Sequence, residues 1–168
     1  MTECTNEDRA DWAAIALTAY TEQAPASLFP APDRAERVRL GVVAAEAMAR
    51  TVFRNPVEQV VDGEESAERV IGDLITYVFC LADEQASPDA LTRAAEELRS
   101  TAYPVTLAAL CEVAAAEAER VAAMLAALFE AAEAFGCDVP AMIDSSREWF
   151  ELLKEAEEAE EADNAVSM

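Results

Sequence analysis

The chain has 168 residues, 53 % of them hydrophobic, and a formal net charge of −22 from 34 acidic and 12 basic residues. Phosphate neutralisation needs basic patches, so this charge argues against direct nucleic-acid binding. The sequence contains no histidine, which excludes histidine general bases, histidine-ligated zinc and the Glu-x-x-His di-iron bundle. Any site must therefore be built from carboxylates.

The cysteines and the hydropathy of the chain indicate its compartment. Cys4, Cys80, Cys111 and Cys137 form no CxxC pair, and we expect buried free thiols in a reducing cytoplasm. Residues 1–12 are polar and acidic, unlike a signal peptide. No uncharged stretch reaches the roughly 18–20 residues that span a bilayer. These features predict a cytoplasmic protein without a membrane segment.

The hydrophobic periodicity of the first half of the chain predicts helices and gives little support for strands. The first helix is expected over residues 6–23, capped by Thr5 or Asn6, and the second over residues 33–53. A connection that can hold a short helical turn follows. The third helix, over residues 64–84, has the clearest apolar pattern and is expected to be central.

The helical pattern continues in the second half. Ser87 and Pro88 begin a fourth helix that ends near Thr101. A long fifth helix is expected over residues 105–135. It ends at Gly136, which can adopt the left-handed conformation that closes a helix.

A sixth helix begins near Pro140 and fades into an acidic tail. The predicted fold class is therefore all-α, a bundle of about six helices. We divide the chain into a helical region at residues 1–104, a helical hairpin at residues 105–155 that packs on it, and a flexible acidic tail at residues 156–168.

The tetrapeptide Ala-Glu-Arg-Val occurs three times, beginning at Ala35, Ala67 and Ala118. The offsets between the copies are unequal, so they do not form a solenoid repeat. The segments that begin at Ala67 and Ala118 share a looser similarity, each reading as a helix, a turn and a second helix. Duplication and an alanine-rich helical composition explain this similarity about equally well.

One segment, DGEESAERVIGDLITYVFCLADEQASPDALTRAAEELRSTAYP at residues 62–104, carries a family resemblance. Its matching features are Gly72-Asp73, Tyr77, Leu81-Ala82-Asp83, the short helix from Leu91 to Leu98, and Tyr103-Pro104. Upstream, RLGVVAAEAMAR at residues 39–50 matches a preceding helix. With these features, residues 8–104 resemble the all-α nucleotide pyrophosphohydrolases of the MazG type. The chain is then expected to have a MazG-like first half and a helical C-terminal extension.

The resemblance implies hydrolysis of nucleoside triphosphates with Mg²⁺, which is held by carboxylates of two adjacent helices, and a homodimer. Asp73 matches the family's aspartate, and Glu46 lies on the upstream helix. Val70 stands where the family has a glutamate partner, so Glu65 and Glu68 are considered as replacement ligands. The implied metal ligands are thus Asp73, Glu46, Glu68 and Glu65, with activity that is weak, altered or lost.

Other interpretations stand beside the resemblance. Asp73, at the border of an apolar face, fits either a metal ligand or a structural ion pair or cap. The net charge supports a different class, a non-catalytic acidic helical protein that binds a basic partner as an adaptor, inhibitor or DNA mimic. A third interpretation is an apolar ligand held between the C-terminal helices. Trp149 and Phe150 are expected to be packing residues.

Overall fold

The computed structural model describes residues 3–25, 32–100 and 107–167, and for residues 107–116 it describes the backbone alone. The described residues are all-helical, without strands, which confirms the predicted fold class. The elements are α1 (Asn6–Gln23), α2 (Arg34–Val52), the 3₁₀-helix η1 (Pro56–Gln59), α3 (Glu64–Leu81), α4 (Pro88–Ser100), α5 (Leu107–Ala134) and α6 (Val139–Val166).

Polar side chains cap the starts of several helices. The Thr5 hydroxyl accepts a hydrogen bond from the backbone N–H of Asp8 (3.1 Å), while the Asp8 carboxylate accepts one from the Thr5 N–H (2.9 Å). This reciprocal pair is a capping box. At α4, the Ser87 hydroxyl accepts from the Ala90 N–H (3.1 Å), and Pro88 is the first helical residue. Both helix starts confirm the predicted caps.

The end of α5 is fixed by Gly136, whose φ of 90° is left-handed. Its N–H donates to the carbonyl of Glu133, and the N–H of Cys137 donates to the carbonyl of Ala132, each at 3.0 Å. These two bonds form a Schellman motif, in which glycine avoids the strain of a side chain at positive φ. The predicted helix end is confirmed.

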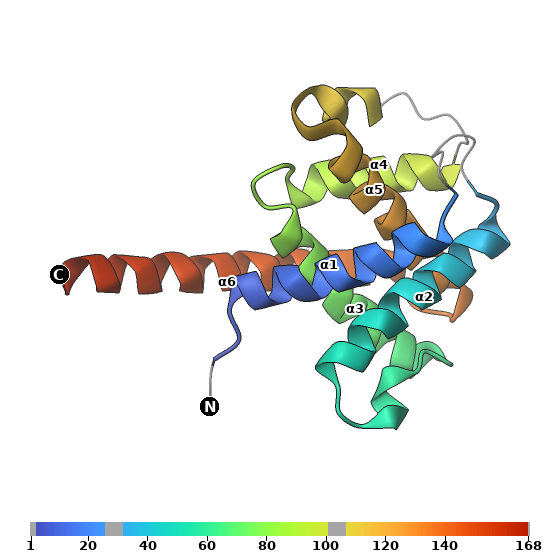
Figure 1. Ribbon diagram of the computed structural model, residues 1–168, viewed down its shortest axis with the longest axis horizontal. Coiled ribbons are helices and arrows are strands. Elements are labelled where there is room, and N and C mark those ends of the chain that lie inside the picture. The colour runs from blue at the N-terminus through green and yellow to red at the C-terminus, as the bar shows by residue number, and fades with distance from the viewer. Residues whose placement is uncertain (1–2, 26–31, 101–106, 168) are drawn as a thin grey trace.

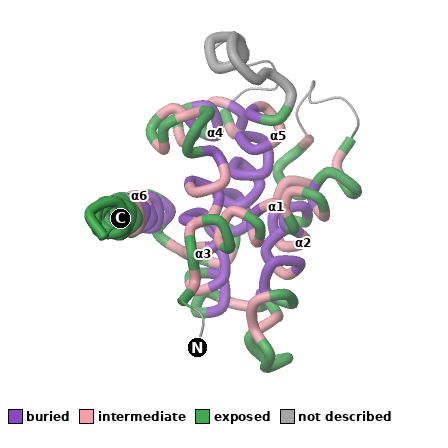
Figure 2. The backbone as a smooth tube through the Cα atoms, turned by 60° about the vertical axis from the view of Figure 1, so that its left-hand side comes forward, coloured by how far each residue is buried: buried purple, intermediate pink, exposed green. Residues whose placement is uncertain are grey.

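The core is centred on α5 as well as on α3. Every residue from 121 to 132 is buried, with α2 and α4 packed around α5 and with α1 and α6 packed on α3 (Figure 1; Figure 2). The expected hairpin at residues 105–155 differs from this arrangement, because α5 and α6 contact each other little. The physical reason is that α5 is buried all round over residues 121–132, where Glu130 is the one charged residue, so this stretch needs neighbours on several sides.

Helices α2 and α5 approach closely at Gly41. A Cβ at this position would overlap the carbonyl oxygen of Ala127 and would lie 2.7 Å from its carbonyl carbon and 2.9 Å from the Cβ of Ala131. Only a residue without a side chain fits here. The alanines of α5 and this glycine therefore set a short distance between the two helices.

Helix α6 extends well beyond the body of the molecule, as Figure 1 shows. It continues to Val166 through the segment predicted to be a flexible tail, and residues 155–167 are all exposed. Alanine and glutamate have high helix propensity, which accounts for helical structure where tertiary packing contributes little. The segment is acidic and solvated as predicted, but the structure differs in making it a helix.

The described part of the chain contains no helix with the length and low polarity needed to cross a lipid bilayer. Cys4, Cys80 and Cys137 are free thiols and are half-buried rather than fully buried. The side chain of Cys111 lies outside the described residues. Burial raises the pKa of Cys80 to about 11, so this thiol is protonated at neutral pH.

Candidate functional site

A groove with a volume of about 500 Å³ runs between α3 and the first half of α6. Its walls are formed by Arg9, Glu64, Glu68, Arg69, Gly72, Asp73, Thr76, Tyr77, Cys137, Asp138, Ala141, Met142, Ser145, Ser146, Trp149 and Leu153. Four of these side chains are carboxylates and two are guanidinium groups, so the groove is acidic. Its volume lies within the range of small-molecule sites, roughly 300–1,000 Å³.

Asp73 lies midway along α3 and is half-buried in the wall of the groove. Burial raises the pKa of its carboxyl group, and the charge of Arg69, one turn earlier, offsets part of that effect. Within the described residues the Asp73 carboxylate makes no hydrogen bond or ion pair, so the structure does not place it in a structural ion pair or a cap. A partly buried carboxylate without a partner is costly to the fold, which makes Asp73 the strongest candidate for contact with a ligand.

Tyr77 stands one helical turn after Asp73. Its ring packs against Trp12 of α1, with 5.3 Å between the ring centroids and a tilt of 58°. Burial and then the negative charge of Asp73 raise the pKa of Tyr77 to about 12. Its hydroxyl is thus a neutral hydrogen-bonding group beside the carboxylate at physiological pH.

The structure brings together two of the four predicted metal ligands. Glu68 is exposed and shares the groove with Asp73, whereas Glu65 and Glu46 are not among the wall residues. Glu68 and Asp73 are five residues apart, about 140° around the helix, so they stand on different sides of α3. In the described part of the chain no group of three or more carboxylates or thiols is placed to hold a metal ion.

Two arginines and a helix-cap residue line the groove but were not predicted from the sequence as site residues. Arg9 reaches the groove from α1, and the buried Nε of Arg69 has no hydrogen-bond partner among the described residues. Asp138 caps α6 by accepting a hydrogen bond from the backbone N–H of Ala141 at 3.2 Å. The Asp-Val-Pro pattern at residues 138–140 is a helix-start pattern that could have located Asp138, but nothing in the sequence places α6 beside α3.

The prediction for two adjacent aromatic residues of α6 is right for one and wrong for the other. Phe150 is buried and packs edge-on against Phe79, with ring centroids 6.1 Å apart. Trp149 is 61 % exposed and stands at the groove. The Ser146 hydroxyl donates to the carbonyl of Gly72 (3.2 Å), which ties α6 to α3 one turn before these aromatic residues.

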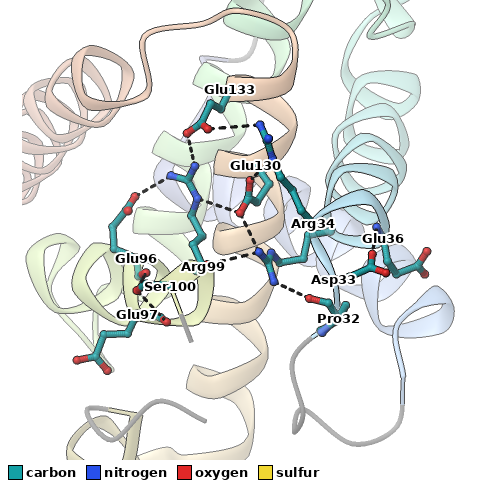
Figure 3. Close-up of polar contacts among 11 residues, drawn as sticks. Pro32, Asp33, Arg34, Glu36, Glu96, Glu97, Arg99, Ser100, Glu130 and Glu133 are labelled. Carbon is teal, nitrogen blue, oxygen red and sulfur yellow. Dashed lines mark hydrogen bonds and ion pairs between the residues drawn. The ribbon is translucent and has the colours of Figure 1, made fainter. Parts of the chain in front are cut away.

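A second polar centre joins α2, α4 and α5. The Glu130 side chain is 6 % exposed, and its oxygens lie 2.9 Å from Arg37, 3.2 Å from Arg34 and 3.4 Å from Arg99 (Figure 3). Arg99 also pairs with Glu133. With both Glu130 oxygens engaged, this cluster is a cross-link between helices.

The electrostatic balance at Glu130 favours its charged form. Burial alone would raise the pKa of this carboxyl group. The hydrogen bond from Arg37 and the charges of Arg99 and Arg37 together outweigh burial and hold the pKa below its ordinary value. The carboxylate is therefore ionised at neutral pH.

The fold and the groove define an all-α helical bundle with an acidic groove beside its third helix. Comparison of the chain with models of protein families, with curated proteins and with solved structures finds no match. The residues of the groove and the sequence pattern of residues 62–104 are therefore the indications of function that the chain offers.

Proposed function

We propose that this chain is a MazG-like protein, related to nucleotide pyrophosphohydrolases, that binds a nucleoside triphosphate with Mg²⁺ in the groove between α3 and α6. The observation that carries the proposal is Asp73. The residue that the family resemblance singles out is also a half-buried carboxylate with no hydrogen bond or ion pair to a described residue, in the wall of a groove of small-molecule size.

The chemistry of the groove fits a hard cation that arrives with its nucleotide. Mg²⁺ is bound through one or two carboxylates plus substrate phosphates, and it keeps several waters, so it does not require a preassembled cage of protein ligands. Asp73 would supply such a carboxylate, and Glu68 adds negative charge to the same groove from another side of α3. The bound ion would neutralise phosphate charge and activate water.

The remaining walls suit the other parts of a nucleotide. Arg9 and Arg69 offer guanidinium groups to phosphate oxygens. Tyr77 and the exposed ring of Trp149 offer aromatic surface to a base. The groove thus combines phosphate donors, metal-binding oxygens and stacking surface.

The test uses the full chain with a panel of nucleoside triphosphates and Mg²⁺ or Mn²⁺, measuring pyrophosphate release and calorimetric binding. Asp73→Asn should lower metal-dependent binding or turnover by at least about tenfold. Glu46→Gln, on α2 outside the groove, should leave both unchanged and is the matched control.

Three results distinguish the forms of this proposal. Turnover supports an active enzyme, and metal-dependent binding without turnover supports a catalytically degenerate one. If the chain shows neither turnover nor metal-dependent nucleotide binding, and metal does not raise its melting temperature, the proposal is wrong. The homodimer implied by the resemblance is measured separately by sedimentation velocity.

The outer part of α6 favours a second candidate function, a non-catalytic acidic protein that binds a basic partner. Residues 151–166 contain seven carboxylates and one lysine, and most of them are exposed. A basic partner held by this surface should bind at low salt and be released at high salt, because salt screens exposed charges.

A further inference from the structure

The outer half of α6 is largely surrounded by solvent, although the Asn6 amide of α1 donates a hydrogen bond to Glu157 at its start (3.0 Å). Residues 155–167 are exposed throughout, as the end-on view in Figure 2 shows. No basic residue occurs in this stretch. Like charges four residues apart, such as Glu151 and Glu155 or Glu157 and Glu161, destabilise an isolated helix. A partner that neutralised these carboxylates would stabilise α6 as it bound.

A line of apolar side chains follows this acidic helix. Trp149, Leu152 and Val166 are 61 %, 57 % and 87 % exposed, which places them among the most exposed large hydrophobic side chains of the described residues. Together with Ala156 and Ala159 they follow the alternating three- and four-residue spacing of a heptad seam. On a helix this spacing forms a stripe roughly 100° wide. We call these five residues the α6 seam.

The charges beside the α6 seam define what can cover it. Glu148 and Glu155 stand on one flank, and Glu160 on the other, in the positions that choose partners in coiled coils. Asp163 occupies the one seam position that is not apolar. A second copy of this chain would place the same carboxylates against these flanks, and like charges across a seam oppose association.

We propose that the α6 seam docks an amphipathic basic helix of a partner protein. The apolar face of that helix covers Trp149, Leu152 and Val166, its flanking lysines or arginines pair with Glu155 and Glu160, and one basic side chain reaches Asp163. Trp149 is the anchor, since tryptophan contributes strongly at interface centres. This inference rests on the second candidate function and does not require a nucleotide in the groove, although both proposals use the ring of Trp149.

The experiment titrates the full chain with a synthetic three-heptad helix that has leucine at its seam positions and lysine on its flanks. A control peptide has the same composition in an order that scatters the leucines around the helix. Emission of the exposed Trp149 should shift to the blue on binding of the patterned peptide. Patterned binding should be at least roughly tenfold tighter than scrambled binding, since only the patterned peptide buries the seam.

Two exposed positions provide matched variants that leave the core intact. Leu152→Ser, in the seam, should reduce patterned binding by roughly tenfold or more. Val57→Ser, at a side chain that is 79 % exposed in η1, should leave it unchanged. Each binding curve is repeated at high salt, where affinity falls but the order of the two peptides is kept.

Other outcomes would overturn the inference in distinguishable ways. Equal, salt-sensitive binding of both peptides would show an acidic surface without a seam, and the second candidate function would stand. If neither peptide bound, both the docking inference and the second candidate function would be wrong. A dimer of the chain alone that Leu152→Ser dissociates would assign the seam to a second copy. Nucleotide binding is measured without peptide, because a helix docked on Trp149 would cover part of the groove wall.

Discussion

Replacing Glu130 by glutamine removes one buried charge while keeping its shape. The Glu130 side chain is 6 % exposed, and those of Arg37 and Arg99 are 14 % and 13 % exposed. The variant leaves two largely buried guanidinium groups without their shared carboxylate. Arg99 keeps its contact with Glu133, so we expect the low end of the cost of breaking a buried pair, a loss of about 3 kcal/mol in the free energy of unfolding.

Urea unfolding at pH 7, followed by circular dichroism, measures this loss. Glu133→Gln is the matched control, because its side chain is 49 % exposed and exposed pairs contribute only about 0–1 kcal/mol. Equal stabilities for Glu130→Gln and Glu133→Gln would refute the assignment of a cross-link to Glu130.

The pH dependence provides an independent check on Glu130. The folded state holds the pKa of this carboxyl group below its ordinary value of 4.5. Its stabilisation is therefore fully present above the ordinary value and is lost as pH falls through the lower folded value. The stability difference between wild type and Glu130→Gln should be constant near neutrality and should close in acid. A difference that persisted unchanged in acid would contradict the reasoning.

Further predictions concern single positions and use urea or thermal unfolding. Gly41→Ala should destabilise by about 1–3 kcal/mol because the new Cβ overlaps Ala127, whereas Gly72→Ala, whose Cβ would lie 3.9 Å from the nearest side-chain atom, should stabilise by roughly 0.5–1 kcal/mol. Equal effects at the two glycines would contradict this account of the α2–α5 approach. Gly136→Ala should cost about 1 kcal/mol through its positive φ, and a neutral effect would show that the end of α5 is not strained. Burial raises the pKa of Asp73, so its ionised form opposes folding, and Asp73→Asn should raise the melting temperature at neutral pH. Wild-type stability should recover as pH falls through the raised pKa, and a variant less stable than wild type at neutral pH would refute this.

Local chemistry made the helices predictable. Ser87 and Pro88 mark a helix start through groups that act within one turn, and Gly136 marks an end in the same way. The packing partners of those helices depend on contacts distant in sequence. Gly41 is only a weak helix residue by propensity, and its role becomes visible only when α5 lies against it.

The candidate site was likewise predictable only in part. Asp73 could be singled out because a carboxylate stood on the border of an apolar stripe, and it lies in the groove. Glu46 could not be excluded, because sequence does not say which face of α2 meets α3. Trp149 belongs to an apolar pattern, yet it is exposed at the groove, while its neighbour Phe150 occupies the buried face of α6.

The central position of α5 also affects how the chain is made. The Arg37–Glu130 contact joins residues 93 positions apart, and the buried stretch at residues 121–132 lies in the last third of the sequence. During synthesis from the N-terminus, the apolar faces of α2 and α4 that pack on this stretch stay uncovered until it has left the ribosome. Until then the nascent chain exposes surface that favours aggregation. A ribosome-bound chain that stops before α5 should therefore be a chaperone substrate, and a chain released after α6 should not.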